Sequence, residues 1–130
     1  MQNKEEKFSV TNTTRSKTPR VDFLNMKNAA LGKDYSLSLV FVGNSTSAKL
    51  NNSYRGKNNP TNVLSFPLDK KNGEIFICMP VAKREAPEFG RKLDNFIAFL
   101  FIHGLMHLKG HDHGDTMDRA ETKLRKRFSV

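Results

Sequence analysis

Three histidines near the C-terminal end of the chain have the spacing of metal ligands. His103, His107 and His113 stand at positions i, i+4 and i+10 of the segment HGLMHLKGHDH. Residues four apart lie on one face of an α-helix with Cβ atoms about 5–6 Å apart, so two imidazoles there can share one ion. Gly110 favours the end of that helix, because glycine enters the left-handed conformation without a Cβ penalty. The chain can then return His113 to the same ion.

Three imidazole ligands leave one zinc position open to water, which is the coordination of a catalytic rather than a structural zinc. We therefore expect one Zn²⁺ per chain, held by His103, His107 and His113. His111 can compete for the third position, but the longer spacing of His113 gives the turn more room to fold back. Asp112 either orients an imidazole from outside the metal shell or bonds its own backbone as a turn residue.

The residue after the first histidine argues against one kind of zinc enzyme. Zinc peptidases with this histidine spacing carry a glutamate there as the general base, whereas this chain has Gly104. A zinc ion can also lower the pKa of water toward about 7 and polarise a phosphate ester. An arginine then suits the phosphate, being permanently charged and bidentate. Arg55, beside Gly56, is the best-placed candidate, although taken alone it could be a solvated surface residue.

The charge balance points to a polyanionic partner. The chain of 130 residues has 22 Lys+Arg against 13 Asp+Glu, a net charge of +9. A surplus of that size indicates most simply a nucleic acid partner, although charge alone is equally consistent with a merely soluble basic surface. No aromatic platform for single strands is expected, because the ten phenylalanines look mostly like core.

Other sequence features bear on location. The longest apolar run, residues 96–108, is shorter than the about 20 residues that span a bilayer, so we expect no membrane segment. The charged N-terminus lacks the apolar stretch of a secretory signal. The single Cys78 suits a reducing cytoplasm.

The hydrophobic pattern predicts one α+β domain over residues 1–130, with a small mixed sheet of about four strands, about five helices and a central buried helix that carries the histidines. In that helix, Gly104 should permit the close approach of a strand or of the substrate. Strands are expected at residues 7–12, 35–42, 63–66 (ended by Pro67) and 74–79, and helices at about residues 19–31, 45–55, 80–86 and 95–109 (capped by Asp94), with a last helix capped by Asp115 or Thr116.

Three segments together resemble the YbeY family of bacterial metal-dependent endoribonucleases. They are LNNSYRGKNNPTNVLSFPL (residues 50–68), GEIFIC (73–78) and HGLMHLKGHDH (103–113), and they occur in the family's order. The resemblance implies zinc on the three histidines and a functional arginine at Arg55. It also implies cleavage of single-stranded RNA in the maturation of 16S rRNA 3′ ends and in ribosome quality control. His111 stands where tyrosine is more usual, and Asn62 where many members have aspartate.

The expected mechanism places His107 and Arg55 at the reacting phosphate. Zinc held by the histidines activates a water or a ribose oxygen, Arg55 neutralises the phosphate, and Lys57 with the wider basic surface holds flanking nucleotides of an rRNA precursor. Because no general base is evident, the alternative is a zinc-containing ribosome assembly or RNA-binding factor with little nuclease activity. A zinc metallopeptidase is a third and weaker alternative.

Overall fold

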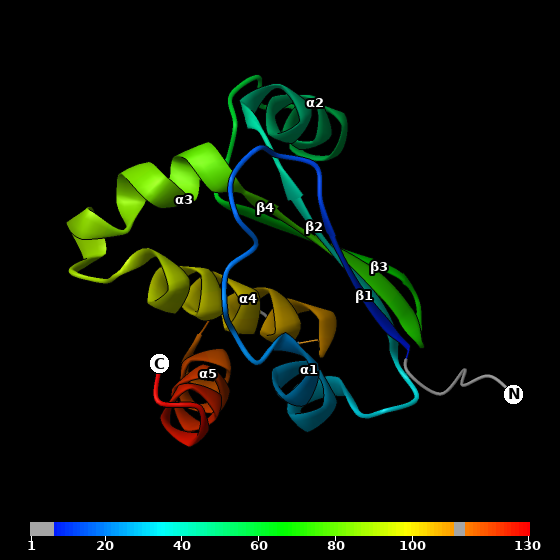
Figure 1. The fold of residues 1–130 in the computed structure, drawn as a ribbon. Coiled ribbons are helices and arrows are strands. Elements are labelled where there is room, and N and C mark those ends of the chain that lie inside the picture. The colour runs from blue at the N-terminus through cyan, green and yellow to red at the C-terminus, as the bar shows by residue number, and fades with distance from the viewer. Residues whose placement is uncertain (1–6, 111–113) are drawn as a thin grey trace, which may run out of the picture.

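The computed structural model of the chain describes residues 7–110 and 114–130. Their fold is α+β, as predicted, with four strands, five α-helices and one short 3-10 helix (Figure 1). The elements in chain order are β1 (Phe8–Asn12), α1 (Phe23–Leu31), β2 (Ser36–Val42), α2 (Asn44–Arg55), β3 (Val63–Asp69), β4 (Asn72–Cys78), α3 (Met79–Glu85), η1 (Pro87–Phe89), α4 (Leu93–Leu108) and α5 (Asp115–Arg127).

The four strands form one mixed sheet in the order β1-β2-β4-β3. β1, β2 and β4 are parallel, and β3 runs antiparallel to β4 at one edge. Successive side chains of a strand point to opposite faces, and the fully buried Leu39, Phe41, Ile75 and Ile77 define the core face. Figure 1 shows α1, α4 and α5 on one side of the sheet and α2 on the other.

The prediction that Pro67 ends its strand is wrong. β3 continues to Asp69, and its register with β4 is irregular between Pro67 and Asp69. Proline has no N–H to donate, so it is tolerated where that side of the strand needs no partner, at an edge or a bulge. Both conditions hold here.

Helix α4 is the central buried helix that the sequence predicted. Its residues Phe96, Ile97, Phe101, Ile102 and Leu105 are fully buried, as expected for a helix that is apolar on nearly every face. It contacts β3 and β4, with α1 and α5 packed along it.

Both predicted helix caps differ by one position or more. α4 begins at Leu93 after Lys92, so Asp94 lies in its first turn, where a carboxylate still interacts favourably with the helix dipole. Likewise, Gly114 precedes the first residue of α5, and Asp115 and Thr116 lie within the helix. These differences move each boundary without changing the elements.

Gly104 is the point of closest approach between α4 and the sheet. A Cβ atom at this position would lie 2.8 Å from Ser65 Oγ and 3.1 Å from Ile75 Cδ1. The Ser65 hydroxyl donates a hydrogen bond of 3.3 Å to the Gly104 carbonyl oxygen. The expectation that this glycine admits a strand is therefore confirmed.

We expect Gly104→Ala to destabilise the fold. A buried overpacked methyl costs about 1–3 kcal/mol, which outweighs the about 1 kcal/mol that alanine gains over glycine in a helix. Chemical denaturation of the wild type, Gly104→Ala, Ser65→Ala and the double variant measures the effect. Because Ser65→Ala removes the nearest clashing atom, the double variant should lose less than the sum of the single variants. A stabilised Gly104→Ala protein would contradict this packing.

Candidate functional site

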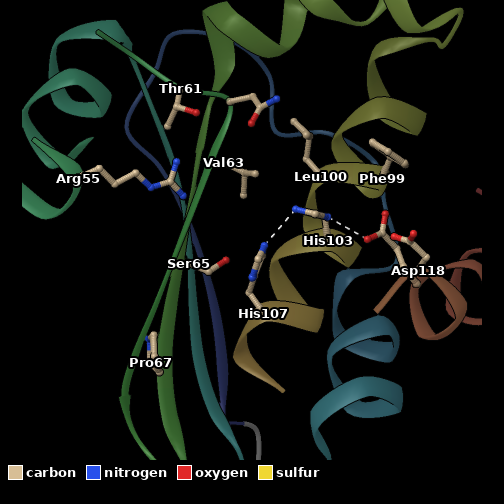
Figure 2. Close-up of a pocket in the computed structure, with 12 residues that line it drawn as sticks. Arg55, Thr61, Val63, Ser65, Pro67, Phe99, Leu100, His103, His107 and Asp118 are labelled. Carbon is tan, nitrogen blue, oxygen red and sulfur yellow. Dashed lines mark hydrogen bonds and ion pairs between the residues drawn. The ribbon is translucent and has the colours of Figure 1, made fainter. Parts of the chain in front are cut away.

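A cavity of about 610 Å³ opens between α4 and β3, with α2 and α5 at its sides (Figure 2). Val63, Ser65 and Pro67 alternate along β3 and face it, and the two histidines face it from α4. Its lining residues are Arg55, Thr61, Asn62, Val63, Ser65, Pro67, Phe99, Leu100, His103, His107, Asp118 and Glu121.

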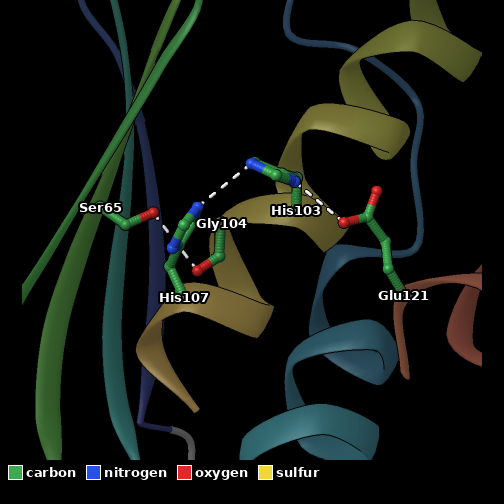
Figure 3. Close-up of polar contacts among 5 residues, drawn as sticks. All are labelled: Ser65, His103, Gly104, His107 and Glu121. Atoms are coloured by element: carbon green, nitrogen blue, oxygen red, sulfur yellow. Dashed lines mark hydrogen bonds and ion pairs between the residues drawn. The ribbon is translucent and has the colours of Figure 1, made fainter. Parts of the chain in front are cut away.

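His103 and His107 lie together on successive turns of α4. Their ring centroids are 4.7 Å apart with an interplanar angle of 83°, and the two Nε2 atoms are 3.1 Å apart (Figure 3). The i, i+4 spacing therefore brings the two imidazole nitrogens together, as the sequence predicted.

Glu121 of α5 contacts the other side of the first imidazole, with 2.9 Å between His103 Nδ1 and Glu121 Oε1 (Figure 3). An ionised carboxylate only accepts hydrogen bonds, so Nδ1 carries the proton. In the neutral ring, this leaves the lone pair on Nε2, directed toward His107. The tautomer of His103 is thus set by a residue 18 positions away in the sequence.

Sequence reasoning missed Glu121, although a signal for it exists. It stands four residues after Met117 and three before Leu124, both of which are buried on the inner side of α5. An acidic residue on the inner stripe of a helix near a histidine-bearing helix is a candidate partner for imidazole. Asp118, one turn earlier, also lines the cavity, so two carboxylates lie on this wall.

Arg55 reaches the cavity from the opposite wall (Figure 2). It is the last residue of α2, and Gly56 follows in the left-handed conformation with φ 69°. Two buried polar side chains fix the loop that follows. Ser47 Oγ donates to the Thr61 carbonyl at 3.0 Å and accepts from the Thr61 N–H at 3.0 Å, and the Asn51 amide donates to the Asn59 carbonyl at 2.8 Å.

Other predicted site residues are not all part of this arrangement. Lys57 is exposed on the loop after α2 and does not line the cavity. His111, Asp112 and His113 lie outside the described residues, so the choice of third ligand stays a prediction. Within residues 7–110 and 114–130, no group of three His, Cys, Asp or Glu side chains could hold a metal ion. No helix in the same ranges is long and apolar enough to cross a membrane.

Comparison with known proteins gives a consistent result. The sequence model of a family described as Endoribonuclease YbeY matches residues 1–128. A curated protein named Endoribonuclease YbeY from Aromatoleum aromaticum is 42% identical over 104 residues, which are 74% of this chain and 68% of the relative. One of the same name from Finegoldia magna is 37% identical over 127 residues, 90% of this chain and 81% of the relative.

The extent of these matches differs between relatives. The chain covers only 60% of the relative from Alteromonas mediterranea, which is 39% identical over 95 residues. Among solved structures, the solution structure of TM1509 from Thermotoga maritima has a TM-score of 0.67 at 23% identity, covering 93% of this chain and 88% of that chain. This last likeness supports the fold.

We expect neutral His103 in metal-free protein to carry its proton on Nδ1. Replacing Glu121 with leucine removes the acceptor, so the ring should shift toward the Nε2–H tautomer. The ¹⁵N chemical shifts of the ring, measured by NMR at a pH where the ring is neutral, report the two forms. Asp118→Asn is the matched control, because it removes a neighbouring carboxylate charge and should leave the tautomer unchanged. An unchanged tautomer in Glu121→Leu would refute the role given to Glu121.

Proposed function

Because the chain belongs to the YbeY endoribonuclease family, we propose that it is a zinc-dependent endoribonuclease that cleaves single-stranded RNA. The substrate that we propose is the 3′ end of the 16S rRNA precursor, in the cytoplasm, with a further role in ribosome quality control. The observation that carries the proposal is the pair of imidazoles on α4 that shares a cavity with Arg55.

The donor atoms of the site fit a zinc ion. Two Nε2 atoms 3.1 Å apart can both lie about 2.0–2.1 Å from one ion. Glu121 contacts Nδ1 of His103, which is the common arrangement for a metal-bound histidine because it fixes the tautomer and raises the basicity of the ring. His103 and His107 would hold the ion, with His113 as the proposed third ligand. When bound, zinc supplies Lewis-acid polarisation of a phosphate ester and a more acidic water.

Residues of the chain divide the remaining work between two walls of the cavity. Arg55 binds the scissile phosphate and neutralises the charge that develops on its oxygens, because a guanidinium matches two phosphate oxygens. On the other wall, the Asp118 carboxylate lines the cavity and accepts the proton of the attacking water or ribose hydroxyl while the oxygen of that nucleophile bonds to phosphorus. The bond from phosphorus to the ester oxygen breaks, and this leaving oxygen takes up a proton from solvent. Asp118 is therefore the general base that we propose, a role for which the sequence alone offered no candidate.

The packing around Gly104 argues against the peptidase alternative. Its Cβ direction points at Ser65 and Ile75, so a glutamate at this position would meet the sheet. The chain therefore has the histidine spacing of these peptidases but no room for their catalytic glutamate. The alternative of an assembly factor with little nuclease activity is separated from the enzyme by the two experiments that follow.

We expect His107→Ala to lose both bound zinc and RNA cleavage, because it removes one of the three imidazoles that we propose as zinc ligands. Zinc per chain is measured by elemental analysis, and cleavage with a labelled single-stranded RNA and nuclease-free protein. Chelation should abolish wild-type cleavage and added Zn²⁺ should restore it. The control is Lys109→Ala, an exposed position just after α4 that does not line the cavity. If His107→Ala binds no zinc yet cleaves RNA normally, the metal is not part of the reaction. If the zinc-loaded wild type cleaves nothing, the assembly factor is favoured.

Arg55→Glu should reduce cleavage by about 100-fold or more, as expected for removal of a charge stabiliser at the reacting group, with zinc content still near one per chain. RNA binding should also become less salt-dependent, with a slope lower by about one phosphate contact. Lys49→Glu makes the same charge change on an exposed turn of α2 and should have a much smaller effect. Loss of zinc in Arg55→Glu would instead mean that Arg55 is structural.

A further inference from the structure

An aromatic pair, one ring of which is exposed, lies next to the cavity but on the other face of the sheet. Tyr54 of α2 stacks on Phe66 of β3, with ring centroids 4.1 Å apart and an interplanar angle of 33°. Phe66 in turn contacts Phe76 of β4, with centroids 5.7 Å apart. Tyr54 is nevertheless 65% exposed. Its inner side is thus supported by a row of rings, and most of the side chain faces solvent.

The pair and the cavity share one strand and one helix end. Along β3, Ser65 and Pro67 face the cavity, so alternation directs Phe66 to the opposite face. Leu68 follows at the irregular register and lines a shallow pocket with Glu74, the residue opposite Phe66. Tyr54 and Arg55 are consecutive at the end of α2, and one lies over the outer face of β3 while the other lines the cavity. Since β3 is an edge strand, a chain that leaves the cavity at Arg55 can pass around this edge to Tyr54.

Core packing does not explain this surface. Leu68, which is 61% exposed, extends the apolar strip on the same edge strand, and exposed apolar residues at a sheet edge favour aggregation. Most of the phenylalanines belong to the core or pack against it, as the sequence predicted, but Phe66 lies outside it and is only partly buried. Exposed apolar residues such as Tyr54 and Leu68 on one face beside a cavity are typical of a binding site.

We propose that the outer face of the Tyr54 ring stacks on a nucleobase adjacent to the phosphate that Arg55 binds. Aromatic side chains beside cations are the usual platform for single strands, because every base has a face that can stack. Arg55 and Lys57 supply the cations at this end. Because Arg55 is the residue next to Tyr54 in α2, a phosphate that it binds would lie beside the Tyr54 ring. This inference rests on the proposed endoribonuclease function.

The test is a double-mutant cycle in which the Tyr54 ring is removed from the protein, one base is removed from the RNA, or both are removed. The probes are single-stranded RNA oligonucleotides of one sequence, intact or with one abasic ribose moved along the chain, cleaved by zinc-loaded protein. Tyr54→Ala should raise KM about fivefold or more, the lower end of the loss for one stacked base, with kcat within about twofold. Tyr54→Phe should behave like the wild type. At one position, abasic RNA should raise KM for the wild type by a similar factor and have little further effect on Tyr54→Ala.

Three results would overturn the proposal. They are an unchanged KM for Tyr54→Ala, a Tyr54→Phe variant as impaired as Tyr54→Ala, and additive losses for ring and base at every abasic position. A drop in self-association of Tyr54→Ala and Leu68→Ala by sedimentation, with an unchanged KM, would identify the strip as a protein interface. If the wild type does not cleave RNA, the proposed function is wrong. The stacking is then tested separately, by measuring the dissociation constants of the same proteins and oligonucleotides with fluorescence anisotropy. Thermal unfolding of Tyr54→Ala checks that this exposed position leaves the fold intact.

Discussion

The close contact between α4 and the sheet at Gly104 fixes the orientation of the reactive side chains. Because a Cβ at this position would meet Ser65 and Ile75, the helix can approach the strands only through this residue. A rotation of α4 by one residue, about 100° for 3.6 residues per turn, would direct side chains into this narrow space. The same rotation would also take apolar residues out of the core. The imidazoles are therefore held at the cavity by the packing of a helix that is apolar on nearly every face.

Side chains of opposite charge line opposite walls of the cavity, because different helices form the two walls. Helix α5 contributes Glu121 and Asp118, whereas the end of α2 contributes Arg55. Since Glu121 contacts the outer nitrogen of His103, the imidazole pair stands between the acidic wall and the cationic one. In the proposed reaction, a substrate phosphate is attracted toward Arg55 and repelled by the two carboxylates, so the proton of the attacking group would face the carboxylates. The charges of these side chains alone thus favour one orientation of a bound phosphate ester, without a contribution from a metal ion.

The residues that sequence reasoning found are those whose roles follow from local spacing. The i, i+4 histidines, the buried helix and the narrow position at Gly104 can all be derived from short segments, because helix periodicity sets their geometry. Helix periodicity places Glu121 on the inner side of α5, but its contact with His103 could not be predicted in this way, since that contact depends on how α5 packs along α4. Tyr54 and Phe66 were missed for a related reason. Whether they are buried depends on β3 lying at the edge, and strand order is not encoded in the local pattern of any one strand. Pro67 could have indicated the edge, but it was interpreted as the end of the strand instead.

Strand β3 contributes side chains to the cavity on one face and to the aromatic pair on the other, which accounts for its mixture of small polar and aromatic residues. Its cavity face needs a small residue opposite Gly104, and Ser65 meets this need while its hydroxyl also bonds the helix backbone. Its outer face carries the ring on which Tyr54 stacks. If RNA passes this edge as we propose, the edge must stay open to solvent, yet an open edge favours pairing with another strand. Pro67 and the irregular register beside it interrupt the run of backbone donors at this edge, so the strand can remain uncovered without offering a continuous template. The access that the proposed chemistry requires and the protection that the fold requires are thus met by the same residues.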